Sequence, residues 1–411
     1  MQKIRCNPDL ENPEGSDCLT CQNINLESKK VIHRLPCLRW KLGEVVMFRD
    51  GGLGLTTRWH GLKMKDLGPR DWTYPNDPPR KIVVTIGCKR QPIELLVRRF
   101  KLIHGDITHK GWIDKNGVQR RIEIPPYALA SIHETVKQYK KYVFCNARIA
   151  IDEYAHKEGV DPLVQKTYAA ALEYAIELEQ QHPSPANGDD VNPSVFLNQY
   201  FSLWFAVRNT LGSSFIVGDD TLDMEPVKDE DCPYRGTVSI PRMIPVQFDS
   251  LGYLKLLAPW RKLVLEGLWK MTASKNPNHF YLIYLTVFMM LHEVSFNCAD
   301  RKRRARENSL NRPYDLLKFV EEVQEGANII LSHWHYYKRD VNEMEIESEE
   351  KKKAVWGSLS SQETQLIVET RQAYKERAAD RTLEPMTWEH DLMFVSQMFE
   401  ENWEPKDTFR R

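Results

Sequence analysis

Residues 280–291 read Phe-Tyr-Leu-Ile-Tyr-Leu-Thr-Val-Phe-Met-Met-Leu, the longest apolar run in the chain. A helix needs about 20 apolar residues to cross a lipid bilayer, so this run is too short for a membrane span. We therefore expect an apolar helix over 280–299 in the body of a soluble protein.

Helical patterns continue through most of the chain on both sides of this run. In 163–181, Val164, Tyr168, Leu172 and Ile176 recur at helical spacing, and the pattern ends before a proline. Further helices are expected at 195–211, 251–271, 314–337, 362–379 and 388–403. The segment 215–245 is rich in turn residues and is expected to be a long ordered loop.

The chain before these helices is predicted to contain β structure. Short β-rich runs occupy 81–87 and 93–102, and Asn116-Gly117 between two apolar runs is a strong hairpin signal. The sequence predicts a mainly α protein: a large helical domain, a small β-containing N-terminal module and a short cysteine-rich segment. The expected divisions are 1–40 for the cysteine-rich segment, 41–125 for the β module and 126–411 for the helical domain.

Composition limits the functions to consider. Of the 411 residues, 42% are hydrophobic and 28% are charged, which excludes wholesale disorder. The formal net charge is zero, so any contact with nucleic acid must be local. The N-terminus has no apolar run typical of a secretory signal, and an intracellular protein with reduced thiols is expected.

Half of the eight cysteines fall in the first forty residues: Cys6, Cys18, Cys21 and Cys37. In a reducing compartment, clustered cysteines indicate metal ligands more readily than disulfides. The pair Cys18 and Cys21 has the Cys-x-x-Cys spacing that suits tetrahedral zinc. The alternative is four unrelated thiols in a frayed terminus.

Charged residues surround this cluster. Lys3 and Arg5 directly precede the first cysteine, where they are expected to contact DNA phosphate. His33 could replace a missing sulfur ligand. The other cysteines, at 88, 145, 232 and 298, are expected to be core or neutral thiols.

The densest basic run of the chain follows the apolar helix. It is a candidate nuclear-import signal and contains Arg301, Lys302, Arg303, Arg304 and Arg306. The alternative is a solvated helix C-terminus, where cations are favourable.

Other motifs offer weaker indications. His333 and His335 stand two apart on a predicted helix and so point to different faces, which favours packing over a shared metal. Asp219 and Asp220 are better explained by turn chemistry than by a cation site. Recognised catalytic and nucleotide-binding motifs are missing from the sequence, and we expect no enzymatic activity.

Several segments together resemble a known family. They are Lys3-Ile4-Arg5-Cys6, Cys18-Leu19-Thr20-Cys21, Leu35 to Leu42, Ile124 to Ala128, Phe215 to Gly218 and Phe394 to Trp403. In these segments the chain is similar to filamentous-fungal proteins related to the binuclear zinc cluster transcription factors. The resemblance spans nearly the whole chain.

The resemblance implies ligand roles for the cysteines. In that family six cysteines bind two zinc ions, and a basic helix before the third cysteine reads DNA. By position, Cys6 corresponds to the third ligand, Cys18 and Cys21 to the fourth and fifth, and Cys37 to the sixth. The first Cys-x-x-Cys is missing, and the last gap is longer than usual. Either the chain begins late or the cluster has been lost, and four thiolates allow one structural zinc at most.

The resemblance therefore implies a nuclear transcription regulator. It would bind DNA through a partial zinc cluster, and its helical body would serve regulation or contact proteins of the transcription machinery. The alternative is a helical interaction or ligand-binding protein that no longer contacts DNA.

Overall fold

The computed structural model describes residues 40–86, 91–181, 191–274, 276–338, 359–380, 385–400 and 403–409, together with Leu19. By internal contacts the chain divides into two compact units. The mixed unit comprises 50–150 and 201–261, and the helical unit comprises 1–49, 151–200 and 262–411. In the sequence, three of the divisions fall within helices: α2 (Ile132–Ala155), α4 (Pro193–Asn209) and α6 (Ala258–Ser274).

A five-stranded antiparallel sheet organises the mixed unit, in the order β5-β2-β1-β6-β7. The strands are β1 (Arg80–Thr85), β2 (Ile93–Arg99), β5 (Tyr127–Leu129), β6 (Phe215–Ile216) and β7 (Val238–Ser239). The side chains of β2 alternate between buried and exposed at most positions, as expected for a strand with one face on the core.

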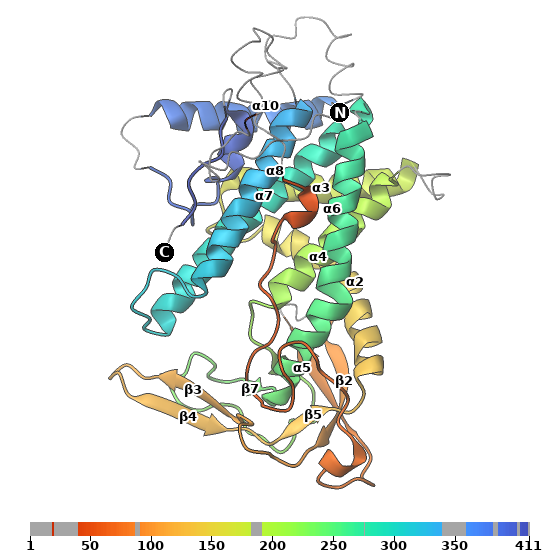
Figure 1. The fold of residues 1–411 in the computed structure, drawn as a ribbon, viewed down its shortest axis with the longest axis vertical. Helices are drawn as coiled ribbons and strands as arrows, with labels where there is room; N and C mark the ends of the chain where they lie inside the picture. The colour runs from red at the N-terminus through yellow and green to blue at the C-terminus, as the bar shows by residue number, and fades with distance from the viewer. Residues whose placement is uncertain are drawn as a thin grey trace, which may run out of the picture. The chain divides into compact units, whose positions relative to one another are not determined.

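A separate hairpin of β3 (His109–Ile113) and β4 (Gln119–Glu123) completes the β structure (Figure 1). Its turn contains Gly117 with a φ of 77°, a conformation that glycine adopts without strain. The Asp114 carboxylate accepts hydrogen bonds from the backbone N–H groups of Asn116 and Val118, both at 2.9 Å. The hairpin predicted from Asn116-Gly117 is therefore confirmed.

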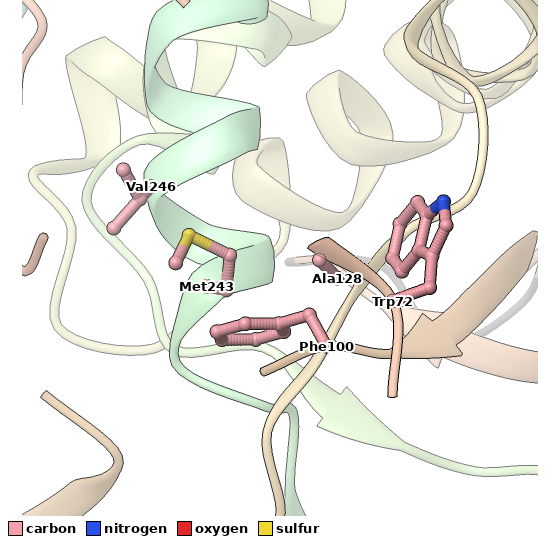
Figure 2. Close-up of a cluster of buried hydrophobic side chains, with 5 residues drawn as sticks. All are labelled: Trp72, Phe100, Ala128, Met243 and Val246. Atoms are coloured by element: carbon pink, nitrogen blue, oxygen red, sulfur yellow. The ribbon is translucent and has the colours of Figure 1, made fainter. Parts of the chain in front are cut away.

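Helix α5 (Met243–Gly252) packs on the five-stranded sheet. Figure 2 shows Met243 and Val246 on the helix beside Phe100, Ala128 and Trp72, and all five side chains are buried. The helix also supplies the Gln247 side chain, whose oxygen accepts a 2.8 Å hydrogen bond from the backbone N–H of Leu129. After α5 the chain makes one π-helical turn, Tyr253–Leu257, before α6 begins.

In the helical unit, α7 (Phe280–Glu307) packs against α8 (Leu317–Lys338) and α3 (Pro162–Gln181), while α10 (Ser361–Ala379) packs against α3 (Figure 1). Helix α7 contains the apolar run 280–291. Together with the preceding turn, it is long and apolar enough to cross a membrane, but 89% of its most apolar window is buried inside the protein. Such burial is typical of the core helix of a folded domain.

Short 3-10 segments complete the fold: Leu42–Glu44, Pro69–Asp71, Pro277–His279 and Val395–Phe399. The first of these packs on α8, where Gly326 permits a close approach. A Cβ atom at position 326 would lie only 3.1 Å from the carbonyl oxygen of Val46.

The mainly α fold with a small β module is confirmed. The expected helix over 388–403 is wrong, because the described part of that segment has only the 3-10 turn Val395–Phe399. The expected loop 215–245 also contains β6, β7 and the start of α5. The three-part division at residues 40 and 125 stays a prediction, and strands of the same sheet lie on both sides of residue 125.

Candidate functional site

The predicted zinc ligands Cys6, Cys18, Cys21 and Cys37, and the predicted DNA contacts Lys3 and Arg5, lie outside the described residues. Their roles stay predictions. Within the described part of the chain, no group of three or more His, Cys, Asp or Glu side chains is arranged to hold a metal ion.

The basic run 301–306 forms the last turns of α7 and is closely paired with acids. Arg301 is only 3% exposed and pairs with Asp300 and Asp315. Lys302 Nζ lies 3.0 Å from a carboxylate oxygen of Glu389. A receptor could not reach Arg301 in this fold, so nuclear import stays a prediction that depends on the more exposed members of the run.

The paired histidines do not share a site. The Nε2 atom of His333 lies 3.1 Å from the carbonyl oxygen of Trp40, and that of His335 lies 2.8 Å from the carbonyl oxygen of Gln397. The His335 ring also stacks on Trp403, with ring centroids 5.1 Å apart. Burial lowers the pKa of His335 to about 3, so this ring is neutral at physiological pH.

The carboxylates near the end of β6 bind an arginine. Arg80 lies 2.5 Å from Asp220 and 2.7 Å from Asp223, and its hydrogen bond holds the pKa of Asp220 below the usual range. Leu222 and Asp223 adopt positive φ angles of 57° and 64° in this loop. Such backbone strain in non-glycine residues is concentrated at functional sites in proteins.

Two of the lone cysteines are buried thiols. Cys298 is fully buried in α7, and burial raises the pKa of its thiol to about 12. Cys232 is also buried, whereas Cys145 is exposed. The Cys298 thiol stays protonated at neutral pH, which agrees with the expected core role of that residue.

The mixed unit contains an open pocket of about 810 Å³. Its wall combines the β3–β4 hairpin with the loop 222–229 and strand β7. Apolar lining residues that are themselves buried include Trp112, Ile124, Leu222, Val227 and Val238. A pocket of this size, lined by both apolar and charged side chains, can hold a small organic molecule.

A lysine lies directly behind this wall. Lys110 on β3 donates a 3.1 Å hydrogen bond from Nζ to Oγ of Ser239, and Ser239 lines the pocket. The ammonium group lies 3.2 Å from the centroid of the Tyr234 ring and 5.3 Å from that of Phe215. Burial, followed by the nearby charge of Arg242, lowers the pKa of Lys110 to about 8.

Sequence reasoning did not single out Lys110, Arg242, Tyr234 or Ser239. The four residues come from 110 and from 234–242, and only the fold brings these segments together. Lys110 is a single basic residue in a short strand, and nothing in the local sequence distinguishes it from an ordinary surface lysine.

The comparison with protein families gives one match. A model described as "KpeA transcription factor" matches residues 53–398. The match begins after the cysteine-rich segment and includes most of both units. No curated protein and no solved structure matches the chain.

Proposed function

Because the chain belongs to the KpeA transcription factor family and is therefore a transcription regulator, we propose that it acts on DNA in the nucleus through its N-terminal segment. The family match supports regulation of transcription. The cysteines and cations of the first forty residues support the more specific proposal of zinc and DNA contact.

In this proposal, Cys6, Cys18, Cys21 and Cys37 hold one structural zinc ion. Four thiolates are a donor set suited to tetrahedral zinc, and the bound metal would supply folding free energy to a segment too small to fold alone. Lys3 and Arg5 would then contact DNA phosphates, which position a protein on the duplex without reading its sequence.

The charges of the body support a local DNA contact. The chain has a formal net charge of zero, and the cations of the basic run 301–306 that the structure describes are largely paired with acids. This run therefore offers little unpaired positive charge to DNA. We assign the body to regulation and to contact with proteins of the transcription machinery, without enzymatic activity.

The test is DNA binding by the purified full-length protein, selected from random duplexes under reducing conditions. We expect bound zinc and an affinity that falls as salt rises, with a slope of log K against log salt of about −2 to −4 for a few phosphate contacts. The double variants Lys3→Gln/Arg5→Gln and Cys18→Ser/Cys21→Ser should lose binding. Cys145→Ser, which changes a lone exposed thiol, is the matched control.

If neither zinc nor salt-dependent DNA binding is found in the wild-type protein, this proposal is wrong. The second candidate, a ligand-binding regulator that does not contact DNA, is then favoured. The 810 Å³ pocket of the mixed unit is the observation that supports that candidate.

A further inference from the structure

Lys110 and Arg242 are two partly buried cations of the mixed unit whose like charges act on each other. Burial lowers the pKa of each cation, and the charge of Arg242 lowers that of Lys110 further. Among the described residues, no carboxylate forms an ion pair with either side chain. Two partly buried cations without a counter-charge are unfavourable unless something neutralises them.

The same protein pairs other buried arginines with acids. Arg58, with a side chain 7% exposed, lies 3.1 Å from Asp106 and 3.3 Å from Asp71. Arg301 is similarly held by Asp300 and Asp315. Lys110 and Arg242 differ from these arginines, because no acid among the described residues pairs with either of them.

Two buried donors in this region also lack partners. Arg242 Nε and Trp112 Nε1 are both buried without a hydrogen bond. Trp112 lies two residues after Lys110, so the two side chains project from the same face of β3. Unsatisfied buried donors are rare in folded proteins and call for an explanation.

The position of Arg242 adds to the positive potential. This residue is the N-cap of α5, a helix of ten residues, and its side chain makes no capping hydrogen bond. The helix dipole is positive at this end, where a cation is unfavourable and an anion is favourable. Helix N-terminus, Arg242 and Lys110 therefore all favour negative charge at one place.

The pocket gives access to this place. Ser239 lines the pocket and accepts a hydrogen bond from Lys110. The ammonium group is therefore in direct contact with a side chain of the pocket wall. Of the lining cations, Arg120 pairs with Asp114, Arg121 with Glu123 and Lys228 with Glu225, whereas Arg99 forms no ion pair among the described residues. The charge of Lys110 adds to this positive charge from behind the wall, whose lining mixes apolar side chains with charged ones of both signs.

We propose that this pocket binds a small organic anion, with its carboxylate or phosphate group at Ser239, attracted by the charges of Lys110 and Arg242 behind the wall, and its apolar part against Trp112 and Val227. In a transcription regulator, such a ligand would act as an effector. The inference goes beyond the proposed function and does not depend on DNA binding.

The test uses the full-length protein with four probes, measured by calorimetric titration and thermal unfolding. Phenylacetate and phenyl phosphate carry the two head groups on the same ring, inorganic phosphate is the bare anion, and phenylacetamide is the neutral analogue. We expect saturable binding of at least one aromatic anion, and at least tenfold weaker binding of phenylacetamide. Tighter binding of phenyl phosphate or of phenylacetate identifies the preferred head group, and binding of inorganic phosphate alone would contradict the apolar part of the site.

Variants test the assigned residues. Lys110→Met and Arg242→Met should each weaken binding of the anion at least tenfold, whereas Lys110→Arg, which keeps the charge, should retain most of it. Lys375→Met and Arg306→Met change exposed cations elsewhere and should bind like the wild type. Circular dichroism checks that each variant is folded.

The pH dependence gives an independent readout. Lys110 faces Arg242, Cys232 and Tyr234, and its charge is lost as pH rises through about 8. Anion affinity should therefore fall several-fold between pH 7 and pH 9.5 in the wild type and stay flatter in Lys110→Arg. Binding that is equal for the neutral amide, unchanged in both methionine variants, or absent for all three anions would overturn the proposal.

Discussion

Lys110 shows how burial can make a single charge unfavourable. The pKa of its ammonium falls from 10.5 in an unfolded chain to about 8 in the folded protein. Between these two pH values the unfolded state binds more protons than the folded state, so stability rises with pH over this window. Below pH 8 the lysine is charged in both states, and the full penalty of burying the charge is present.

This linkage predicts a specific difference from Lys110→Met. Without ligand, the free energy of unfolding of the wild type should rise relative to that of the variant by about 2 kcal/mol between pH 7.5 and pH 9.5. Urea unfolding at the two pH values measures the change. Lys375→Met, which removes an exposed lysine, should follow the wild type; an identical pH response in Lys110→Met would show that the ammonium is not desolvated.

His335 is a second buried base with a lowered pKa, and it affects stability in the acid range. Its pKa is lowered from 6.5 to about 3, so the unfolded chain takes up a proton below pH 6.5 while the folded chain does not. Stability is then lost as pH falls through this window.

We predict that between pH 7 and pH 5 the wild type loses about 2 kcal/mol more unfolding free energy than His335→Gln, which cannot titrate there. The matched control is His60→Gln, which removes an exposed imidazole outside the core. Equal losses in His335→Gln and the wild type would mean that the His335 ring is solvated in the folded state.

At the scale of elements, α5 connects the core of the mixed unit to the charged site. Met243 is 4% exposed and packs with Phe100 and Val246, and the preceding residue is Arg242. Met243→Ala should lower the free energy of unfolding by about 2–4 kcal/mol, since it leaves a cavity in a close-packed core. Leu263→Ala, at a position 47% exposed, should cost less than about 0.5 kcal/mol in the same denaturation experiment.

The pairing of β1 with the segment after β6 depends on a close approach at Gly218. A Cβ atom there would lie 2.8 Å from the Cβ of Val83, and the neighbouring Val217 N–H donates to the Val83 carbonyl at 2.8 Å. Gly218→Ala should therefore destabilise the protein by about 1–3 kcal/mol.

Gly212→Ala is the matched control for this prediction, because no atom lies within 4 Å of the added methyl group. Thermal unfolding of both variants tests the contact. If the two melt at the same temperature, the β1 contact is not close in solution.

Local patterns were enough to predict some elements. The apolar spacing of 163–181 and the Asn116-Gly117 turn each indicate a structure that needs no distant partner, and α3 and the β3–β4 hairpin follow. Strands β6 and β7 have two residues each; β6 depends on pairing with β1, about 130 residues earlier, and β7 on pairing with β6, so local patterns do not define them. The Lys110–Arg242 pair was unpredictable for the same reason.

At the scale of the whole molecule, the family match and the cysteine cluster fall on different parts of the chain. The match covers 53–398, whereas the predicted zinc ligands end at Cys37. The family model therefore matches the body of the protein, which contains both helix α7 and the pocket of the mixed unit. Regulation by the body and DNA contact by the N-terminal segment are separable properties in this account.

The most direct test is genome-wide occupancy of the tagged full-length protein, measured together with transcript levels after its removal. The account predicts discrete occupied sites beside genes whose transcripts change, with occupancy lost in the Cys18→Ser/Cys21→Ser variant and kept in Cys145→Ser. No enrichment over an untagged control, together with unchanged transcripts, would contradict its role as a transcription regulator at DNA.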